Sequence, residues 1–154
     1  GAFDLVFLYM SPALSSTAML DKALAATRQG LCMALYSHRE DSLLSELQAE
    51  FDLPQIPVGS QRADDLYDLF NALYQRGFFP ELRFEERCKT TSYVLDYIFE
   101  RYASWLWRGD EATPERREQL RQSLQRRAAD GQLASTSRDI VGHLYVDKTL
   151  RRGG

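Results

Sequence analysis

The sequence has little of what metal sites and membrane segments require. It contains only two cysteines, Cys32 and Cys88, in 154 residues, and they do not form a metal-binding spacing. Both fall in expected strands, so we expect buried free thiols. No apolar run approaches the roughly 18 residues of a membrane span. Phe3–Tyr9 lacks a basic leader and contains Asp4, unlike a signal peptide. We therefore expect a cytoplasmic protein with no metal and no membrane partner.

The familiar signature motifs are absent as well. The sequence has no GxGxxG, no Walker loop, no HExxH and no GxSxG. A Ser-His-Asp arrangement is left open, because only its best-known local motif is missing. The net charge of −3 and a pI of about 5.4 give no basic signature of nucleic-acid binding. We therefore expect no nucleic-acid partner.

What the sequence does contain is enough apolar material for a folded domain. Hydrophobic residues make up 44% of the chain and aromatic residues 12%, too much for a disordered segment. The length of 154 residues is that of one ordinary domain. We expect a single α/β domain over residues 1–154.

The periodicity of the apolar residues predicts alternating strands and helices in the order β-α-β-α-α-β-α-α-β. Phe3–Tyr9 is a nearly continuous apolar run, typical of a strand covered on both faces. Charged residues alternate along the expected third strand, Glu81–Cys88. This alternation predicts that one face of the strand is exposed to water and that the strand lies near a sheet edge. Asp41 or Ser42 is expected to cap the second helix, and Gly30 is expected to end the first. The other strands are predicted at Leu31–Tyr36, Glu81–Cys88 and Asp139–Asp147.

The predicted helices are apolar on one side, with one exception. They are expected from about Thr17 to Gln29, after Asp41 or Ser42, from Ala63 to Arg76, from Ser92 to Trp107, and between Pro114 and Gly131. The last of these is rich in arginine and glutamate. The interleaved charges favour a solvated surface helix over a face that binds anions.

Two expected loops follow strands, where open α/β sheets bind their ligands. His38 and Arg39 lie in the first of these candidate sites. Their alternative role is helix capping and surface charge. The second loop is Met10-Ser11-Pro12-Ala13, whose small residues leave room for a ligand, although it also reads as a plain turn. His143, within an apolar strand pattern, is interpreted as a structural histidine.

The chain resembles the C-terminal half of class I S-adenosylmethionine-dependent methyltransferases. "FDLVFLYMSPA" resembles their fourth strand and the loop after it, and "GLCMALYSHREDSLLSEL" their fifth strand and helix. "LFNALYQRGFFPELRFEERCKTTSYVLDYIFERY" is similar to a section that contains the sixth strand, and "DGQLASTSRDIVGHLYVDK" to the closing seventh strand. The resemblance implies a Rossmann-like sheet with helices on both faces. Its last strand is antiparallel and lies between the fifth and sixth.

The resemblance also implies a site. Tyr9 and Met10 would contact the cofactor S-adenosylmethionine. Ser11 and Pro12 would contact a small-molecule methyl acceptor, with Ser37, His38 and Arg39 further out. His38 is the one candidate for a catalytic proton acceptor.

The chain departs from the family where the cofactor is mostly bound. It contains neither the glycine-rich turn nor the acidic residue that holds the ribose, so we expect a natural N-terminal part to be missing from this domain. The alternative function is a non-catalytic interaction or scaffold module that has lost cofactor binding. Because Phe3–Tyr9 would then expose an apolar edge, we expect a homodimer or swapped assembly through that strand.

Overall fold

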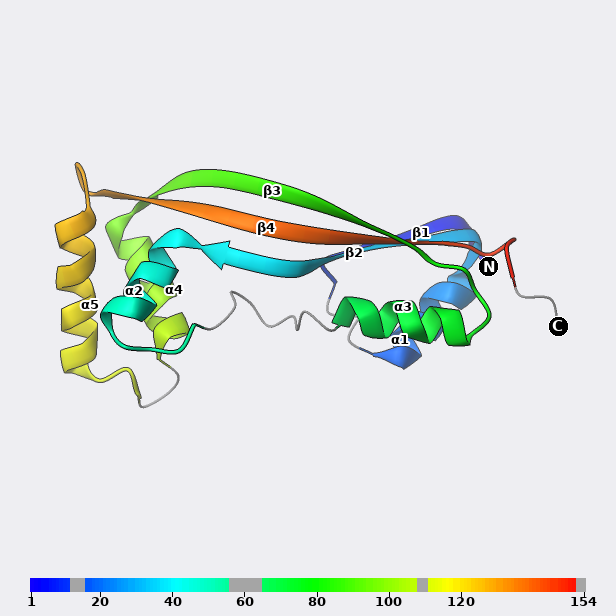
Figure 1. Ribbon diagram of the computed structural model, residues 1–154, viewed down its shortest axis with the longest axis horizontal. Coiled ribbons are helices and arrows are strands. Elements are labelled where there is room, and N and C mark those ends of the chain that lie inside the picture. The colour runs from blue at the N-terminus through cyan, green and yellow to red at the C-terminus, as the bar shows by residue number, and fades with distance from the viewer. Residues whose placement is uncertain (12–15, 56–64, 108–110, 152–154) are drawn as a thin grey trace. The chain divides into compact units, whose positions relative to one another are not determined.

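The computed structural model describes residues 1–11, 16–55, 65–107 and 111–151 (Figure 1). Its elements follow the order expected from the sequence. They are β1 (Phe3–Tyr9), α1 (Thr17–Ala26), β2 (Thr27–Asp41), α2 (Ser42–Glu50), α3 (Asp65–Gln75), β3 (Glu81–Val94), α4 (Leu95–Leu106), α5 (Pro114–Arg127) and β4 (Gln132–Asp147).

The strands form one sheet in the order β1-β2-β4-β3. β1 and β2 are parallel. β4 runs antiparallel to β2, since the Lys148 N–H donates to the Gln29 carbonyl at 2.7 Å while Arg39 pairs with Asp139 at 3.0 Å. Residue numbers therefore increase along β2 in the direction in which they decrease along β4, as in an antiparallel pair. The antiparallel last strand in an inner position was predicted correctly, as was the edge position of β3.

Three strands are longer than their apolar patterns predicted, because their ends are polar and are held by pairing with neighbouring strands. One difference between the predicted and the observed strand bounds concerns Gly30. It lies inside β2, and α1 already ends at Ala26, so the prediction that Gly30 ends the helix was wrong. A Cβ at Gly30 would lie 3.2 Å from side-chain atoms of Leu5 and Tyr145, so glycine allows these two side chains to close over β2.

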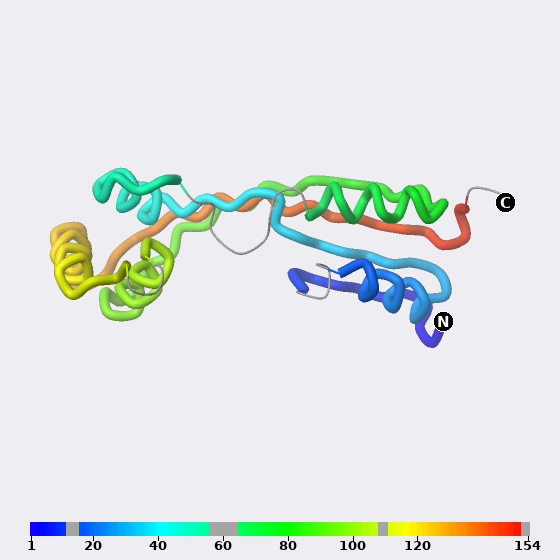
Figure 2. Tube along the Cα trace, turned by 90° about the horizontal axis from the view of Figure 1, so that it is seen from below, coloured from blue at the N-terminus to red at the C-terminus, as the bar shows by residue number. Residues whose placement is uncertain are grey.

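The chain divides into two compact units. The first, unit 1, comprises residues Gly1–Arg39, Gly59–Arg87 and Asp139–Gly154. Its helices α1 and α3 lie on the same side of the strands (Figures 1 and 2). Asp21 of α1 forms an ion pair of 2.8 Å with Arg76, the residue that follows α3. Its core is one cluster of buried residues from both helices, β2 and β4: Leu20, Ala23, Leu24, Leu31, Met33, Leu35, Leu66, Leu69, Leu73, Phe78, Leu144 and Val146.

The other face of the sheet in unit 1, here called the open face, is not covered by a helix of the described residues. The prediction that Phe3–Tyr9 is covered on both faces was therefore wrong. Val6 and Leu8 pack against the core, but the alternate side chains are exposed: Phe3 by 60%, Leu5 by 55%, Phe7 by 60% and Tyr9 by 47%. The apolar run predicted the strand itself correctly, but most of its apolar side chains lie on the open face.

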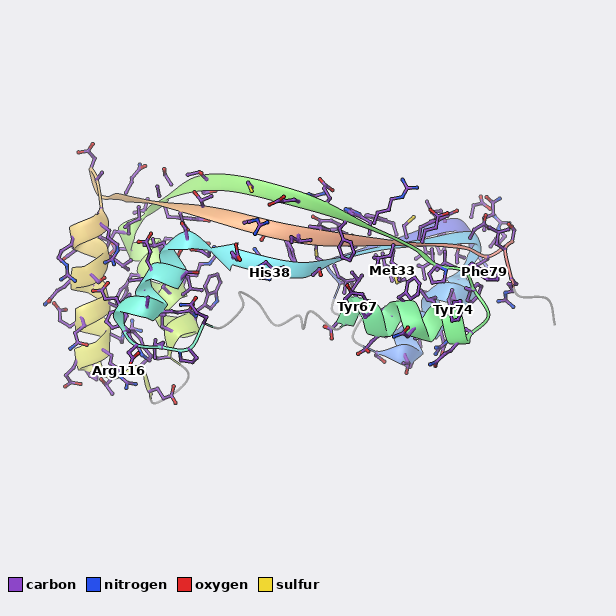
Figure 3. The ribbon with its side chains drawn as sticks, viewed as in Figure 1. Met33, His38, Tyr67, Tyr74, Phe79 and Arg116 are labelled. Carbon is purple, nitrogen blue, oxygen red and sulfur yellow. The ribbon has the colours of Figure 1, made fainter. Side chains whose placement is uncertain are left out.

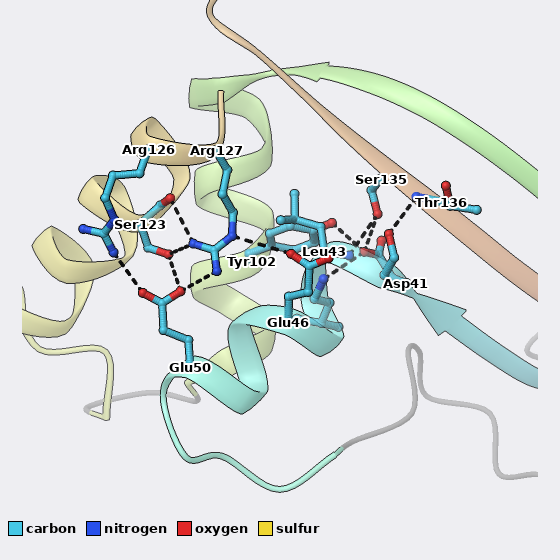
Figure 4. A network of polar contacts seen from close by, with 12 residues as sticks. Asp41, Leu43, Glu46, Glu50, Tyr102, Ser123, Arg126, Arg127, Ser135 and Thr136 are labelled. Atoms are coloured by element: carbon cyan, nitrogen blue, oxygen red, sulfur yellow. Dashed lines mark hydrogen bonds and ion pairs between the residues drawn. The ribbon is translucent and has the colours of Figure 1, made fainter. Parts of the chain in front are cut away.

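The second unit, unit 2, comprises Glu40–Val58 and Cys88–Arg138 and has its own core from α2, α4 and α5. Asp41 caps α2, as one of the two predicted alternatives, and its carboxylate is buried (Figure 4). The Oδ1 atom accepts hydrogen bonds from the Leu44 N–H at 3.0 Å, the Tyr102 hydroxyl at 2.7 Å and the Ser135 hydroxyl at 2.6 Å. Asp41 thus caps a helix and joins α2, α4 and β4 at one atom.

A second polar cluster ties α2 to α5 in the same unit (Figure 4). Glu50 accepts a hydrogen bond from Ser123 at 2.7 Å and forms ion pairs with Arg126 at 2.9 Å and Arg127 at 2.7 Å. These hydrogen bonds, first that of Ser123, hold the pKa of the Glu50 carboxyl below its usual range. The arginines at the end of α5 therefore help to hold unit 2 together.

The two free cysteines lie in strands as predicted, but they are not buried. Cys32 is half-buried on β2, and Cys88 is exposed on the edge strand β3. The partial burial of Cys32 raises the pKa of its thiol. Among the described helices, none is long and apolar enough to cross a membrane.

Candidate functional site

The first part of the candidate site is the carboxyl end of β1, where the chain turns out of the sheet. The N–H of Met10, the residue after β1, donates to the Ala34 carbonyl of β2 at 2.8 Å. Met10 has a φ of 47°, a left-handed conformation that is uncommon outside glycine and marks a sharp change of direction. Ser11 is half-buried next to it. Pro12 lies outside the described residues.

Tyr9, the last residue of β1, is joined by its side chain to a polar cluster on the open face. The Arg87 guanidinium on β3 donates from Nη1 to the Tyr9 hydroxyl oxygen at 3.1 Å. Its Nε and Nη2 atoms donate to the two carboxylate oxygens of Glu85 at 2.9 and 2.7 Å. His143 on β4 approaches the same carboxylate, with 3.0 Å between Nε2 and Oε2 of Glu85. We call Tyr9, Glu85, Arg87 and His143 the tyrosine–arginine cluster.

The electrostatics of this cluster favour the charged forms of Glu85 and Arg87. The hydrogen bond from Arg87, and next that from His143, lower the pKa of the Glu85 carboxyl from 4.5 to about 2. The pKa of Arg87 is raised in turn by Glu85 and by Tyr9. Because the Tyr9 oxygen accepts a hydrogen bond from Arg87, its own O–H is directed to other acceptors. The cluster can therefore orient an acceptor atom of a ligand on the open face.

His38 and Arg39 lie elsewhere than the sequence predicted. Both belong to β2 rather than to a loop after it, and Figure 3 shows His38 on that strand. Four residues of strand separate His38 from Ala34, or about 13 Å at the usual rise. Arg39 donates from Nε to Asp139 at 3.0 Å, and its guanidinium lies 4.1 Å from the centre of the Tyr36 ring. The structure thus brings Tyr9, Met10 and Ser11 together, with Ser37, His38 and Arg39 further along β2.

The residues that sequence reasoning missed are Glu85, Arg87 and His143. The alternation along β3 carried a signal, since it put Glu85 and Arg87 on the same side of the strand. Nothing in the sequence linked them to Tyr9, which lies on the opposite edge strand of the sheet. His143 lies in an apolar strand pattern, yet its side chain is 37% exposed and contacts a carboxylate.

A shallow pocket of about 340 Å³ in unit 2 is lined by Phe99 and by the first turns of α5. Its arginines are already paired with carboxylates of α4: Arg117 with Glu100 at 2.8 Å and Arg121 with Asp96 at 3.4 Å. This pairing favours the interpretation of α5 as a solvated surface helix. Among the residues that the structure describes, no group of three His, Cys, Asp or Glu side chains could hold a metal ion.

Comparisons with known proteins give likenesses to solved structures. No family model matches the chain, and no curated protein matches it either. A solved structure from Bacillus halodurans C-125, described as a "putative methyltransferase", is 12% identical with a TM-score of 0.41, and the likeness covers 94% of this chain and 64% of that one. The chain thus spans less than two thirds of that structure. A likeness this distant does not identify the family of the chain.

Proposed function

We propose that the chain supplies the methyl-acceptor side of an S-adenosylmethionine-dependent methyltransferase. The observation that supports this most is the sheet, in which β4 is antiparallel and lies between β2 and β3 while β1 and β2 are parallel. The sequence resemblance implies the same arrangement. A second support is the turn at Met10, which opens the carboxyl end of β1, where ligands of α/β sheets bind.

In this proposal Tyr9 and Met10 contact the cofactor. The cofactor supplies an electrophilic methyl group on a sulfonium. The Tyr9 ring is 47% exposed and stacks on Phe7 with 6.2 Å between ring centres, so its free face suits a cation. Arg87 holds the Tyr9 hydroxyl, which fixes the direction of the ring. The residues present therefore fit the sulfonium end of the cofactor, while the sequence offers no glycine-rich loop for the rest.

Ser11, Pro12, His38 and Arg39 are the proposed contacts of the methyl acceptor. The chain's task is to hold a nucleophile in line with the methyl group and to exclude water, which is catalysis by proximity. His38, an exposed residue on β2, is proposed to accept the proton of a hydroxyl or amine acceptor. Unchanged turnover in a His38→Ala enzyme would remove that role.

The test is calorimetric titration of the 154-residue chain with S-adenosylhomocysteine. We expect micromolar binding that is lost in Tyr9→Ala and retained in Tyr67→Ala, a matched loss of an exposed tyrosine on α3. Circular dichroism shows whether each variant is folded. A folded chain that gives neither heat nor a thermal shift contradicts the proposal for these residues.

The alternative is a non-catalytic interaction module. It is favoured by the exposed apolar row on β1, since such patches mark binding surfaces for proteins. The titration separates the two functions, because an interaction module binds no S-adenosylhomocysteine.

A further inference from the structure

The outer edge of β1 presents backbone groups that are unused among the described residues. The Ala2 N–H donates to the carbonyl of Ala26, the residue before β2, and the Met10 N–H donates to the carbonyl of Ala34 in β2. Because the N–H and C=O directions alternate along a strand, the even-numbered residues of β1 face β2 and the odd-numbered ones face outward. Phe3, Leu5, Phe7 and Tyr9 thus offer donors and acceptors to another strand.

The same odd-numbered residues carry the exposed apolar side chains of the open face. Their patch extends across the sheet, because a Cβ at Gly30 would lie within 3.2 Å of both Leu5 and Tyr145. Tyr145 on β4 is itself 38% exposed. An outward row of backbone groups next to an exposed apolar row is a template for strand addition.

We propose that the outer edge of β1 pairs with β1 of a second copy, antiparallel about a two-fold axis at Val6. In this register Phe3 lies opposite Tyr9 of the copy and Leu5 opposite its Phe7, and all of them have outward-facing backbone groups. Each then donates and accepts a hydrogen bond in the narrow-pair pattern of antiparallel strands. A register shifted by two residues leaves an end residue unpaired, so the axis at Val6 uses the edge most fully.

The charges favour β1 over the other edge of the sheet. Asp4 is the only charged residue of β1, and it is paired with Arg28 at 3.1 Å. In the proposed register Asp4 lies opposite Leu8 of the copy, so like charges do not meet. The edge strand β3 carries charges instead on both of its faces, including Arg83, Glu85, Glu86 and Lys89, which protects it from pairing.

The contact is small, which predicts a weak dimer. An aromatic side chain has roughly 200 Å² of surface, so four side chains that are about half exposed present on the order of 400 Å² per copy. Both copies together stay below the roughly 1,200 Å² at which stable interfaces begin. The dimer is therefore reversible and grows with concentration. This inference does not depend on the proposed function.

The test combines sedimentation with amide exchange over about 10 μM to about 1 mM chain. We expect the mass to rise above the 17.7 kDa of one chain. The amides of Leu5, Phe7 and Tyr9 should become protected as it does, whereas those of Val6 and Leu8 should be protected throughout.

Two edge variants and one control sharpen the test. Phe7→Pro removes an outward N–H and retains the pairing of β1 with β2, and Leu5→Lys places a charge on the edge. Both should remain monomeric, while Phe84→Ser, which loses an exposed phenylalanine on β3, should dimerise like the parent chain. If Phe7→Pro fails to fold, Leu5→Lys decides.

Three results overturn the inference. One is a monomer at every concentration, with the outward amides exchanging freely. Another is a dimer in which those amides stay unprotected, because the copies then meet at another surface. The third is a monomer in which they are protected, because another segment of the same chain then covers the edge.

Discussion

Glu85 is the residue on which the contacts of the tyrosine–arginine cluster converge. Its carboxylate receives Arg87 through both oxygens and His143 through one of them. All these groups are at least partly exposed, so water screens their charges and the cluster orients side chains more than it stabilises the fold. The effect of the cluster should therefore appear as a lowered pKa of Glu85 rather than as a large gain in stability.

The first prediction concerns the pH dependence of Glu85. Its pKa in the folded chain is about 2, below the ordinary 4.5, so the stabilisation is complete above pH 4.5 and is lost as the pH falls toward 2. We expect the carboxyl carbon of Glu85 to titrate near pH 2 by NMR. Arg87→Gln should raise this midpoint more than His143→Gln does, because Arg87 is the larger cause. A parent midpoint near 4.5 would contradict the cluster.

Single residues also show what the sequence can predict. The cap of α2 could be predicted, as Asp41 or Ser42, because a cap acts on backbone groups a few residues away. The contact between Tyr9 and Arg87 could not be predicted, because it joins residues 78 positions apart. Local chemistry can be read from local sequence, whereas contacts between distant strands require the strand order first.

At the scale of elements, α3 packs closely on β4 where Leu66 meets Gly142. Gly142 lies under Leu66, and a Cβ at this glycine would come so close to the leucine Cδ2 atom that one of them must move. Leu66 is fully buried in the core of unit 1. The packing of the helix on the strand thus depends on a missing side chain at Gly142.

The second prediction is a double-mutant cycle at this contact. Gly142→Ala should lower the free energy of unfolding by about 1–3 kcal/mol through overpacking, and Leu66→Ala by about 2–5 kcal/mol through a cavity. Because the new methyl group can enter the space that the leucine leaves, the double variant should lose less than the two single losses together. Urea unfolding measures all three. Strict additivity would show that the two residues do not interact.

The types and order of the elements were predicted correctly, but the lengths of three strands were not. Apolar periodicity reports the buried part of an element, so it gave β4 only from Asp139, whereas the strand begins at Gln132. The extra residues are held by cross-strand contacts such as that between Thr90 and Thr136, at 2.9 Å. Such contacts leave no period in the sequence.

At the scale of the whole molecule, the two units have separate cores. The buried residues of unit 1 and of unit 2 form two clusters that have no member in common. The sequence did not reveal this division, because the apolar faces of α2 and α3 look alike although their residues enter different cores. The strand order, in contrast, was implied by the sequence resemblance.

The third prediction is that damage to one core is local. Leu47→Ala in α2 should weaken amide protection throughout unit 2 and leave unit 1 nearly unchanged, and Leu73→Ala in α3 should do the reverse. Both leucines are fully buried, so the substitutions are matched. Native-state hydrogen exchange resolves the two patterns. Equal loss of protection in both units would show that they unfold as one.

The route of the chain between the units bears on how such a protein can be remodelled. The chain leaves unit 1 after Arg87 and re-enters it at Asp139, along the neighbouring antiparallel strands β3 and β4. Glu85 and His143 already face each other just inside these two crossing points. A short hairpin turn can therefore join the two strands in place of residues 88 to 138, provided that residues 40 to 58 are replaced as well, because α2 shares the core of unit 2 with α4 and α5. Unit 2 thus consists of two insertions into the chain of unit 1, which evolution or an engineer can exchange or remove together without changing the strand order of unit 1.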